Sequence, residues 1–118
     1  MTTPYEEGDP SSPILLLGEA PSHNELREGR PFCGPAGQLL DKCLHAAGIA
    51  RATTYILNVF PDMIRKPRDD TSKILSRDNE LLWTSTKGFT EAGRAAAAPT
   101  LARLASSQAN VIVPLGGP

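Results

Sequence analysis

The sequence has little of what builds metal centres, disulfide frameworks and strongly charged surfaces. Its 118 residues include two cysteines and two histidines, and 12 Lys or Arg stand against 13 Asp or Glu, for a net charge of −1. Two cysteines make no disulfide framework, so a reducing, cytoplasmic setting is expected. A nearly neutral chain has no overall field for nucleic acid, so such contact needs a local patch. No apolar run approaches the ~20 residues of a membrane span, and no membrane partner is expected.

Glycine and proline are frequent, and they separate short apolar runs in a pattern typical of an α/β protein. Residues 1–13 are polar and contain three prolines, so we expect a disordered lead-in to a single domain over residues 14–118. The predicted strands are residues 14–17, 54–59 and 110–115, and the predicted helices are residues 36–47, 73–83 and 90–107. Strand, crossover helix and strand form a βαβ unit, which favours parallel pairing.

The helix over residues 36–47 carries one apolar stripe, which predicts its buried face. The stripe consists of Ala36, Leu39, Leu40, Cys43, Leu44 and Ala47. It places Cys43 in the core. The apolar strand over residues 110–115 is also predicted to be buried, yet only three residues follow it. We therefore expect either that the chain is the N-terminal part of a longer domain or that another element covers this strand.

The loop that follows the first strand is the first candidate for a binding site, because open α/β sheets bind ligands beyond the carboxyl ends of their strands. Gly18 lets the backbone approach a ligand closely, and Pro21 stiffens the turn. Glu19 or Glu25 could polarise a water or stabilise a developing positive charge. The alternative is an ordinary turn with solvated carboxylates.

Phe32 and Asn58 are the candidates for contact with a flat ligand. Phe32 lies in a glycine- and proline-rich loop, where an aromatic ring can stack on a base; the alternative is a ring that fills the core. Asn58 ends the second predicted strand, and its amide offers a donor and an acceptor together; the alternative is a turn-forming asparagine.

A short basic cluster follows the second strand. Arg65, Lys66 and Arg68 could bind phosphates, or they could belong to a solvated loop. Cys33 and Cys43 lie ten residues apart with no zinc-like spacing, so no metal site is predicted. A glycine-rich phosphate-binding fingerprint is also absent from the sequence.

Taken jointly, these residues resemble the uracil-DNA glycosylase superfamily, above all its family 4 and related phage-type branches. The resemblance is carried by Gly18-Glu19-Ala20-Pro21, Glu25, Gly29-Arg30-Pro31-Phe32, Gly34, Ala36-Gly37-Gln38-Leu39-Leu40-Asp41, Ala47-Gly48-Ile49, Arg51, Tyr55-Ile56 and Asn58-Val59. It implies a three-layer α/β/α sandwich around a central parallel sheet, with its C-terminal part missing here. It also implies extrusion of uracil from DNA and hydrolysis of the N-glycosidic bond.

The resemblance implies a role for each candidate residue. Gly18, Ala20, Pro21 and Ser22 would form the loop that contacts uracil and positions water. Glu19 and Glu25 are the candidate catalytic carboxylates, on the basis of their position in this loop alone. Phe32 would stack on the extruded base, and Asn58 would read its polar edge. The partners implied are uracil-containing DNA and, for phage-type relatives, a DNA polymerase or another replication protein.

The sequence departs from the family in three places. Ser22 stands where the family usually has glycine. The four cysteines that hold an iron–sulfur cluster in family 4 are not matched, so no cofactor is expected. The histidine loop that completes the family's active site is not reached by residue 118. The last departure keeps an alternative open, in which the chain is a catalytically inactive relative that binds nucleic acid or a partner protein.

Overall fold

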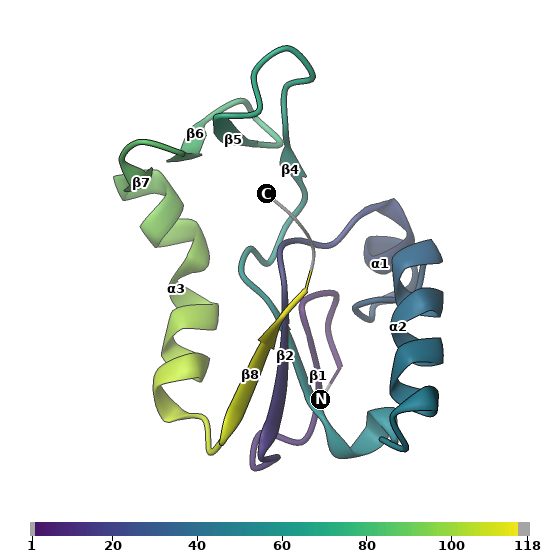
Figure 1. The fold of residues 1–118 in the computed structure, drawn as a ribbon. Helices are drawn as coiled ribbons and strands as arrows, with labels where there is room; N and C mark the ends of the chain where they lie inside the picture. The colour runs from purple at the N-terminus through teal and green to yellow at the C-terminus, as the bar shows by residue number, and fades with distance from the viewer. Residues whose placement is uncertain (1, 116–118) are drawn as a thin grey trace.

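The computed structural model describes residues 2–115 as a three-layer α/β/α arrangement with a small sheet at one end (Figure 1). The central sheet has the order β1 (Glu6–Gly8), β3 (Tyr55–Asn58), β2 (Ile14–Gly18) and β8 (Val111–Pro114). Helices α1 (His23–Glu28) and α2 (Pro35–Ala46) lie on one side of it, and α3 (Glu91–Ser106) lies on the other. The short 3₁₀ helix η1 (Arg51–Thr53) leads into β3. No described helix is long and apolar enough to cross a membrane.

The centre of the sheet is parallel, as the βαβ pattern predicts. Strand β2 pairs in parallel with β3 on one side and with β8 on the other. Alternate residues of β2 point to opposite faces, so Leu16 packs against α2 while Leu15 packs on the side of α3. This two-sided burial explains the unbroken apolar run of β2, and it confirms the α/β class with a parallel core.

The expectation of a disordered lead-in over residues 1–13 is wrong for the described part of that segment. Strand β1 pairs antiparallel with β3. Its carboxylates are the partners of three distant arginines, since Glu6 pairs with Arg103 and Glu7 pairs with Arg51 and Arg30. The polar composition that predicted disorder therefore reflects long-range ion pairs.

The predicted helix over residues 73–83 is also wrong. Strands β5 (Lys73–Ser76) and β6 (Leu81–Thr84) form a hairpin there, and β4 (Ile64–Arg65) and β7 (Gly88–Phe89) complete a second sheet. Asn79 adopts a left-handed φ of 68° in the turn, a conformation that asparagine tolerates and a helix does not. Ile74 and Leu82 both point into a cluster that joins this sheet to α3.

The apolar stripe of α2 is only half buried. Leu40 and Leu44 pack on the sheet, whereas Leu39 is 63% exposed and Cys43 is exposed as well. Placing Cys43 in the core was therefore wrong. The row of Leu40 and Leu44 packs on the sheet, whereas the neighbouring row of Leu39 and Cys43 does not.

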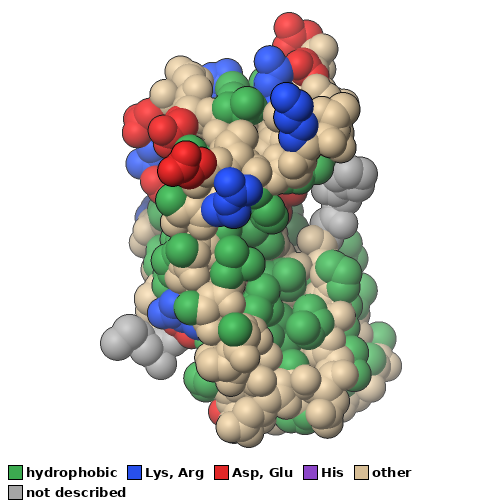
Figure 2. All heavy atoms as spheres, turned by 90° about the vertical axis from the view of Figure 1, so that its left-hand side faces the viewer, with side chains coloured by type: hydrophobic (Ala, Val, Ile, Leu, Met, Phe, Trp, Pro, Cys, Tyr) green, Lys and Arg blue, Asp and Glu red, His purple; other side chains and the backbone are tan. Residues whose placement is uncertain are grey.

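Strand β8 is where it was predicted, but it is not buried. It lies at the edge of the sheet, and Val111, Ile112 and Val113 are all exposed. Figure 2 shows hydrophobic side chains gathered over α3 and β8 on the lower part of this face. The described residues therefore leave this edge uncovered, and coverage by another element stays a prediction.

One hydrogen bond between α3 and β3 generates a stability prediction. The fully buried hydroxyl of Thr100 donates to the carbonyl oxygen of Asn58 over 2.6 Å. Thr100→Val keeps the shape but removes this donor, so we expect a loss of about 1–2 kcal/mol in the free energy of unfolding, measured with urea. Thr86→Val, at an exposed position, should change it by less than about 0.5 kcal/mol. Equal effects of the two substitutions would contradict the role given to this contact.

Candidate functional site

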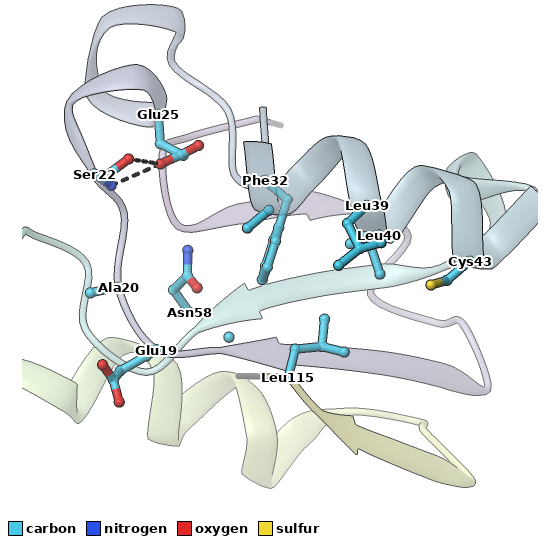
Figure 3. A pocket seen from close by; sticks show the side chains of 12 residues that line it. Glu19, Ala20, Ser22, Glu25, Phe32, Leu39, Leu40, Cys43, Asn58 and Leu115 are labelled. Carbon is cyan, nitrogen blue, oxygen red and sulfur yellow. Dashed lines mark hydrogen bonds between the residues drawn. The ribbon is translucent and has the colours of Figure 1, made fainter. Parts of the chain in front are cut away.

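A pocket of about 510 Å³ opens at the carboxyl ends of β2 and β3, beside α2 (Figure 3). Its lining residues are Gly18, Glu19, Ala20, Ser22, Glu25, Phe32, Ala36, Leu39, Leu40, Cys43, Asn58 and Leu115. The lining is largely apolar with a few polar groups, which is typical of sites for small flat ligands. The position agrees with the general rule for ligand sites in open α/β sheets.

Gly18, Phe32 and Asn58 meet at the centre of this pocket. Gly18 and Asn58 are direct partners in the register of β2 and β3, so the two strand ends lie side by side. A Cβ atom on Gly18 would lie 2.3 Å from Asn58 Oδ1 and 2.4 Å from Phe32 Cζ. Only glycine therefore allows the ring and the amide to approach the same stretch of backbone.

Hydrogen bonds to the backbone of Asn58 fix its position, while its side-chain carboxamide makes no hydrogen bond within the described residues. The residue is 2% exposed, its N–H donates to the Tyr5 carbonyl oxygen over 2.9 Å, and its carbonyl accepts from Thr100. Within residues 2–115 no group hydrogen-bonds to the carboxamide, yet no buried side-chain N or O there lacks a partner. The amide must therefore face the open pocket, with a donor and an acceptor available.

The Phe32 loop is fixed in an uncommon conformation. Phe32 has a φ of 50°, which costs free energy in any residue with a side chain. The Arg51 guanidinium donates to the carbonyl oxygens of Pro31 over 2.6 Å and Phe32 over 2.9 Å. On the other side, α2 comes so close that a Cβ on Gly37 would lie 1.8 Å from the Phe32 carbonyl oxygen. These contacts hold the ring over Gly18.

Glu25 links the two loops that border the pocket. One carboxylate oxygen accepts from the backbone N–H of Ser22 over 2.9 Å and from its hydroxyl. The other accepts from the N–H groups of Cys33 and Gly34, each at a distance of 3.1 Å. Burial would raise the pKa of Glu25, but the hydrogen bonds from Ser22 and Cys33 outweigh it and lower the pKa to about 2. The carboxylate is thus ionised and fully engaged.

Glu19 is engaged on the opposite side. Its carboxylate pairs with Lys66 Nζ over 2.6 Å, and Figure 3 shows it turned away from the Phe32 ring. Of the predicted phosphate-binding residues, Lys66 therefore lies beside the site, whereas the Arg65 guanidinium donates to Asn79 Oδ1 over 2.6 Å. Arg68 is exposed in the same loop.

The structure brings together most of the residues that the sequence selected. Gly18, Ala20, Phe32 and Asn58 line one pocket, and buried Pro21 shapes its loop. Ser22 is the N-cap residue of α1, and its hydroxyl donates to the Glu25 carboxylate. The sequence analysis missed the wall from α2, formed by Leu39 and Cys43, and it gave Arg51 no role. The apolar stripe of α2 is wider than the one row that packs on the sheet, and this width could have indicated that α2 also lines a pocket.

The residues present do not fit a four-cysteine iron–sulfur cluster. Two thiols are too few, and Cys33 donates to Glu25 over 3.4 Å while Cys43 is exposed on α2. Burial and the neighbouring Glu25 carboxylate raise the pKa of the Cys33 thiol, which disfavours the thiolate that a metal needs. Over residues 2–115, no three His, Cys, Asp or Glu side chains gather as a metal site would require.

Comparison with known proteins gives the same picture as the geometry. The family described as the Uracil DNA glycosylase superfamily matches residues 5–118, nearly the whole chain. The chain is 43% identical over 68 residues to a type-4 uracil-DNA glycosylase of Sulfurisphaera tokodaii, which covers 54% of this chain and 31% of that protein.

Other type-4 uracil-DNA glycosylases are similar to a comparable extent. The one from Thermotoga maritima is 45% identical over 53 residues, covering 45% of this chain and 28% of that protein. The one from Archaeoglobus fulgidus is 35% identical over 75 residues, covering 64% and 38%. The matched segment thus spans well under half of each relative's length, and the predicted resemblance to family 4 is confirmed.

The low pKa of Glu25 predicts a pH dependence. A carboxyl whose pKa falls from 4.5 to about 2 on folding adds stability that is fully present above pH 4.5 and is lost as the pH falls through 2. Glu25→Gln should therefore reduce the free energy of unfolding by about 2–3 kcal/mol at pH 7, with the difference shrinking towards pH 2.

Denaturant unfolding at several pH values measures this difference. Glu28→Gln, which changes an exposed carboxylate of the same helix, is the matched control and should give a small difference at each pH. A Glu25→Gln difference that stays constant from pH 7 to pH 2 would show that the carboxylate does not hold the two loops as described.

Proposed function

This chain belongs to the Uracil DNA glycosylase superfamily, and from that premise we propose that it is a DNA-repair N-glycosylase. In this proposal it binds a uracil that has left the helix stack and hydrolyses the bond between the base and the sugar. The names of the relatives point to the same reaction. The expected cytoplasmic location and DNA polymerase partner stay predictions.

The observation that carries the proposal is the unpaired amide of Asn58 beside the Phe32 ring. Uracil is flat and presents a carbonyl oxygen next to an N–H on its polar edge. A carboxamide offers the complementary donor and acceptor, and a phenyl ring offers a stacking surface. Both groups face one pocket and are held by contacts to their own backbones. Such preorganisation favours binding without an ordering cost.

The loop from Gly18 to Ser22 fits the chemistry of bond cleavage. In the transition state the sugar gains positive charge and the departing uracil gains negative charge. A nearby carboxylate stabilises the positive charge on the sugar, and main-chain N–H groups stabilise the negative charge on the departing uracil. We assign Glu19 to the water and to the cationic sugar, because it lines the pocket; this role requires its carboxylate to leave Lys66 and turn inward. Glu25 is a positioning residue that orients Ser22 and the Phe32 loop.

DNA phosphates are assigned to the basic loop. Lys66 stands beside Glu19, and Arg65 and Arg68 are exposed near it. A chain with a net charge of −1 relies on such a local cluster to bind a polyanion. Contacts of this kind fix the register of the strand but carry no base specificity.

A uracil-excision assay tests the proposal. The full chain is incubated with a single-stranded oligonucleotide that carries one uracil, and abasic sites are then cleaved with alkali. Asn58→Ala removes the only described amide that faces the pocket centre, and it should lower the excision rate by ~10²–10³. Phe32→Leu removes the stacking surface and should weaken binding of the base by roughly 1–3 kcal/mol. Asn110→Ala, at an exposed position, is the control and should leave the rate unchanged.

The assay also separates the two readings of the sequence. Strand cleavage that depends on Asn58 supports the glycosylase. Retained binding of the oligonucleotide without strand cleavage by the unaltered chain would instead support the catalytically inactive binding module. Cleavage that is insensitive to both Asn58→Ala and Phe32→Leu would contradict the site itself.

A further inference from the structure

A second, smaller pocket lies behind Glu19, between the end of β3 and the small sheet. Its volume is about 190 Å³, and its lining residues are Glu19, Val59, Phe60, Lys66, Thr71, Ile74, Trp83 and Phe89. Glu19 lines both this pocket and the larger one. The two pockets are therefore neighbours that share Glu19, whose carboxylate pairs with Lys66 of the second pocket.

The second pocket holds the only tryptophan of the chain and two of its three phenylalanines. Phe60 and Phe89 meet edge to face, with ring centroids 6.0 Å apart and an interplanar angle of 68°. Phe60 is buried in the cluster that joins the small sheet to α3, and Trp83 packs against the same cluster. These contacts fix the rings in place.

Part of this aromatic surface is left open. Phe89 is 36% exposed, and Trp83 is only partly buried. Both rings line the cavity. Aromatic rings with a free face are the groups on which the bases of a single strand stack.

One basic side chain in the lining, Lys66, can contact the phosphate of a nucleic acid. Arg68 is exposed further along the chain, whereas Arg65 ends β4 and its guanidinium donates to Asn79 Oδ1. Glu19 is the only acidic residue in the lining, and it is already paired with Lys66. A ligand that is flat, aromatic and joined to a phosphate matches both features.

We propose that this second pocket binds the nucleobase next to the extruded uracil in the same DNA strand. The base stacks on the exposed faces of Trp83 and Phe89, and the phosphate between the two nucleotides lies at Lys66. The identity of the ligand rests on the proposed function, because it takes the occupant of the larger pocket to be a nucleotide of DNA. The second pocket would give the protein an interaction with a single strand that needs no uracil.

The single tryptophan makes this binding directly observable. The full chain is titrated with a short oligothymidylate, and the fluorescence of Trp83 is followed; a strand of equal length made of abasic units is the matched ligand control. We expect saturable quenching by oligothymidylate and none by the abasic strand, since only the former carries bases to stack. Equal responses to oligothymidylate and the abasic strand, or no response to either, would overturn the proposal.

Two variants and a control test the contacts proposed for this pocket. Phe89→Leu changes an exposed ring and should weaken oligothymidylate binding by about tenfold or more, from the stacking free energy of one base. Lys66→Gln should weaken binding and reduce its salt dependence, whereas Lys42→Gln on α2 should do neither. An unchanged dissociation constant in Phe89→Leu would refute the stacking role.

Phe32→Leu distinguishes failure of this inference from failure of the proposed function. It should impair uracil excision yet leave the quenching of Trp83 intact. Loss of quenching in this variant would place the bound base in the larger pocket and overturn the inference. If the unaltered chain excises no uracil but still shows base-dependent quenching, the proposed function fails while the second base-binding pocket stands.

Discussion

The buried carboxylate of Glu25 is the link on which the pocket depends. It receives hydrogen bonds from Ser22 on one loop and from Cys33 and Gly34 on the other, so neither loop can shift alone. Arg51 also fixes the Phe32 loop, because its guanidinium donates to the carbonyl oxygens of Pro31 and Phe32. Together the two side chains stabilise a left-handed Phe32 that would otherwise be unfavourable.

The consequence is a site whose parts are fixed before any ligand arrives. The ring of Phe32 and the amide of Asn58 converge on Gly18 from different elements, and each is held through its own backbone. The charged side chains around the site form ion pairs, between Glu7 and Arg51 and between Glu19 and Lys66. Glu19 lines both the larger pocket and the aromatic one, so the two pockets share a residue.

The sequence predicted those parts of the fold that local pattern controls. The continuous apolar run of β2 and the helical stripe of α2 gave the βαβ unit, and the ends of its two strands placed Gly18 beside Asn58. Strand β1 could not be predicted, since it is held by pairing with β3 and by arginines that lie far along the chain. The β5–β6 hairpin was misread because its leucine and isoleucine spacing mimics a weak helix, while Asn79 decides the turn. Cys43 was misplaced because a helical stripe predicts one apolar face but not how much of that face the sheet covers.

The central claim is that the Asn58 amide reads the edge of a uracil stacked on Phe32. Nuclear magnetic resonance of the Asn58 side-chain NH₂ group, assigned by its disappearance in Asn58→Ala, tests this claim most directly during titration with free uracil. The account predicts a saturable shift of that NH₂ signal with uracil and a much smaller one with adenine. An NH₂ signal that stays in place while signals elsewhere in the protein respond to uracil would contradict it.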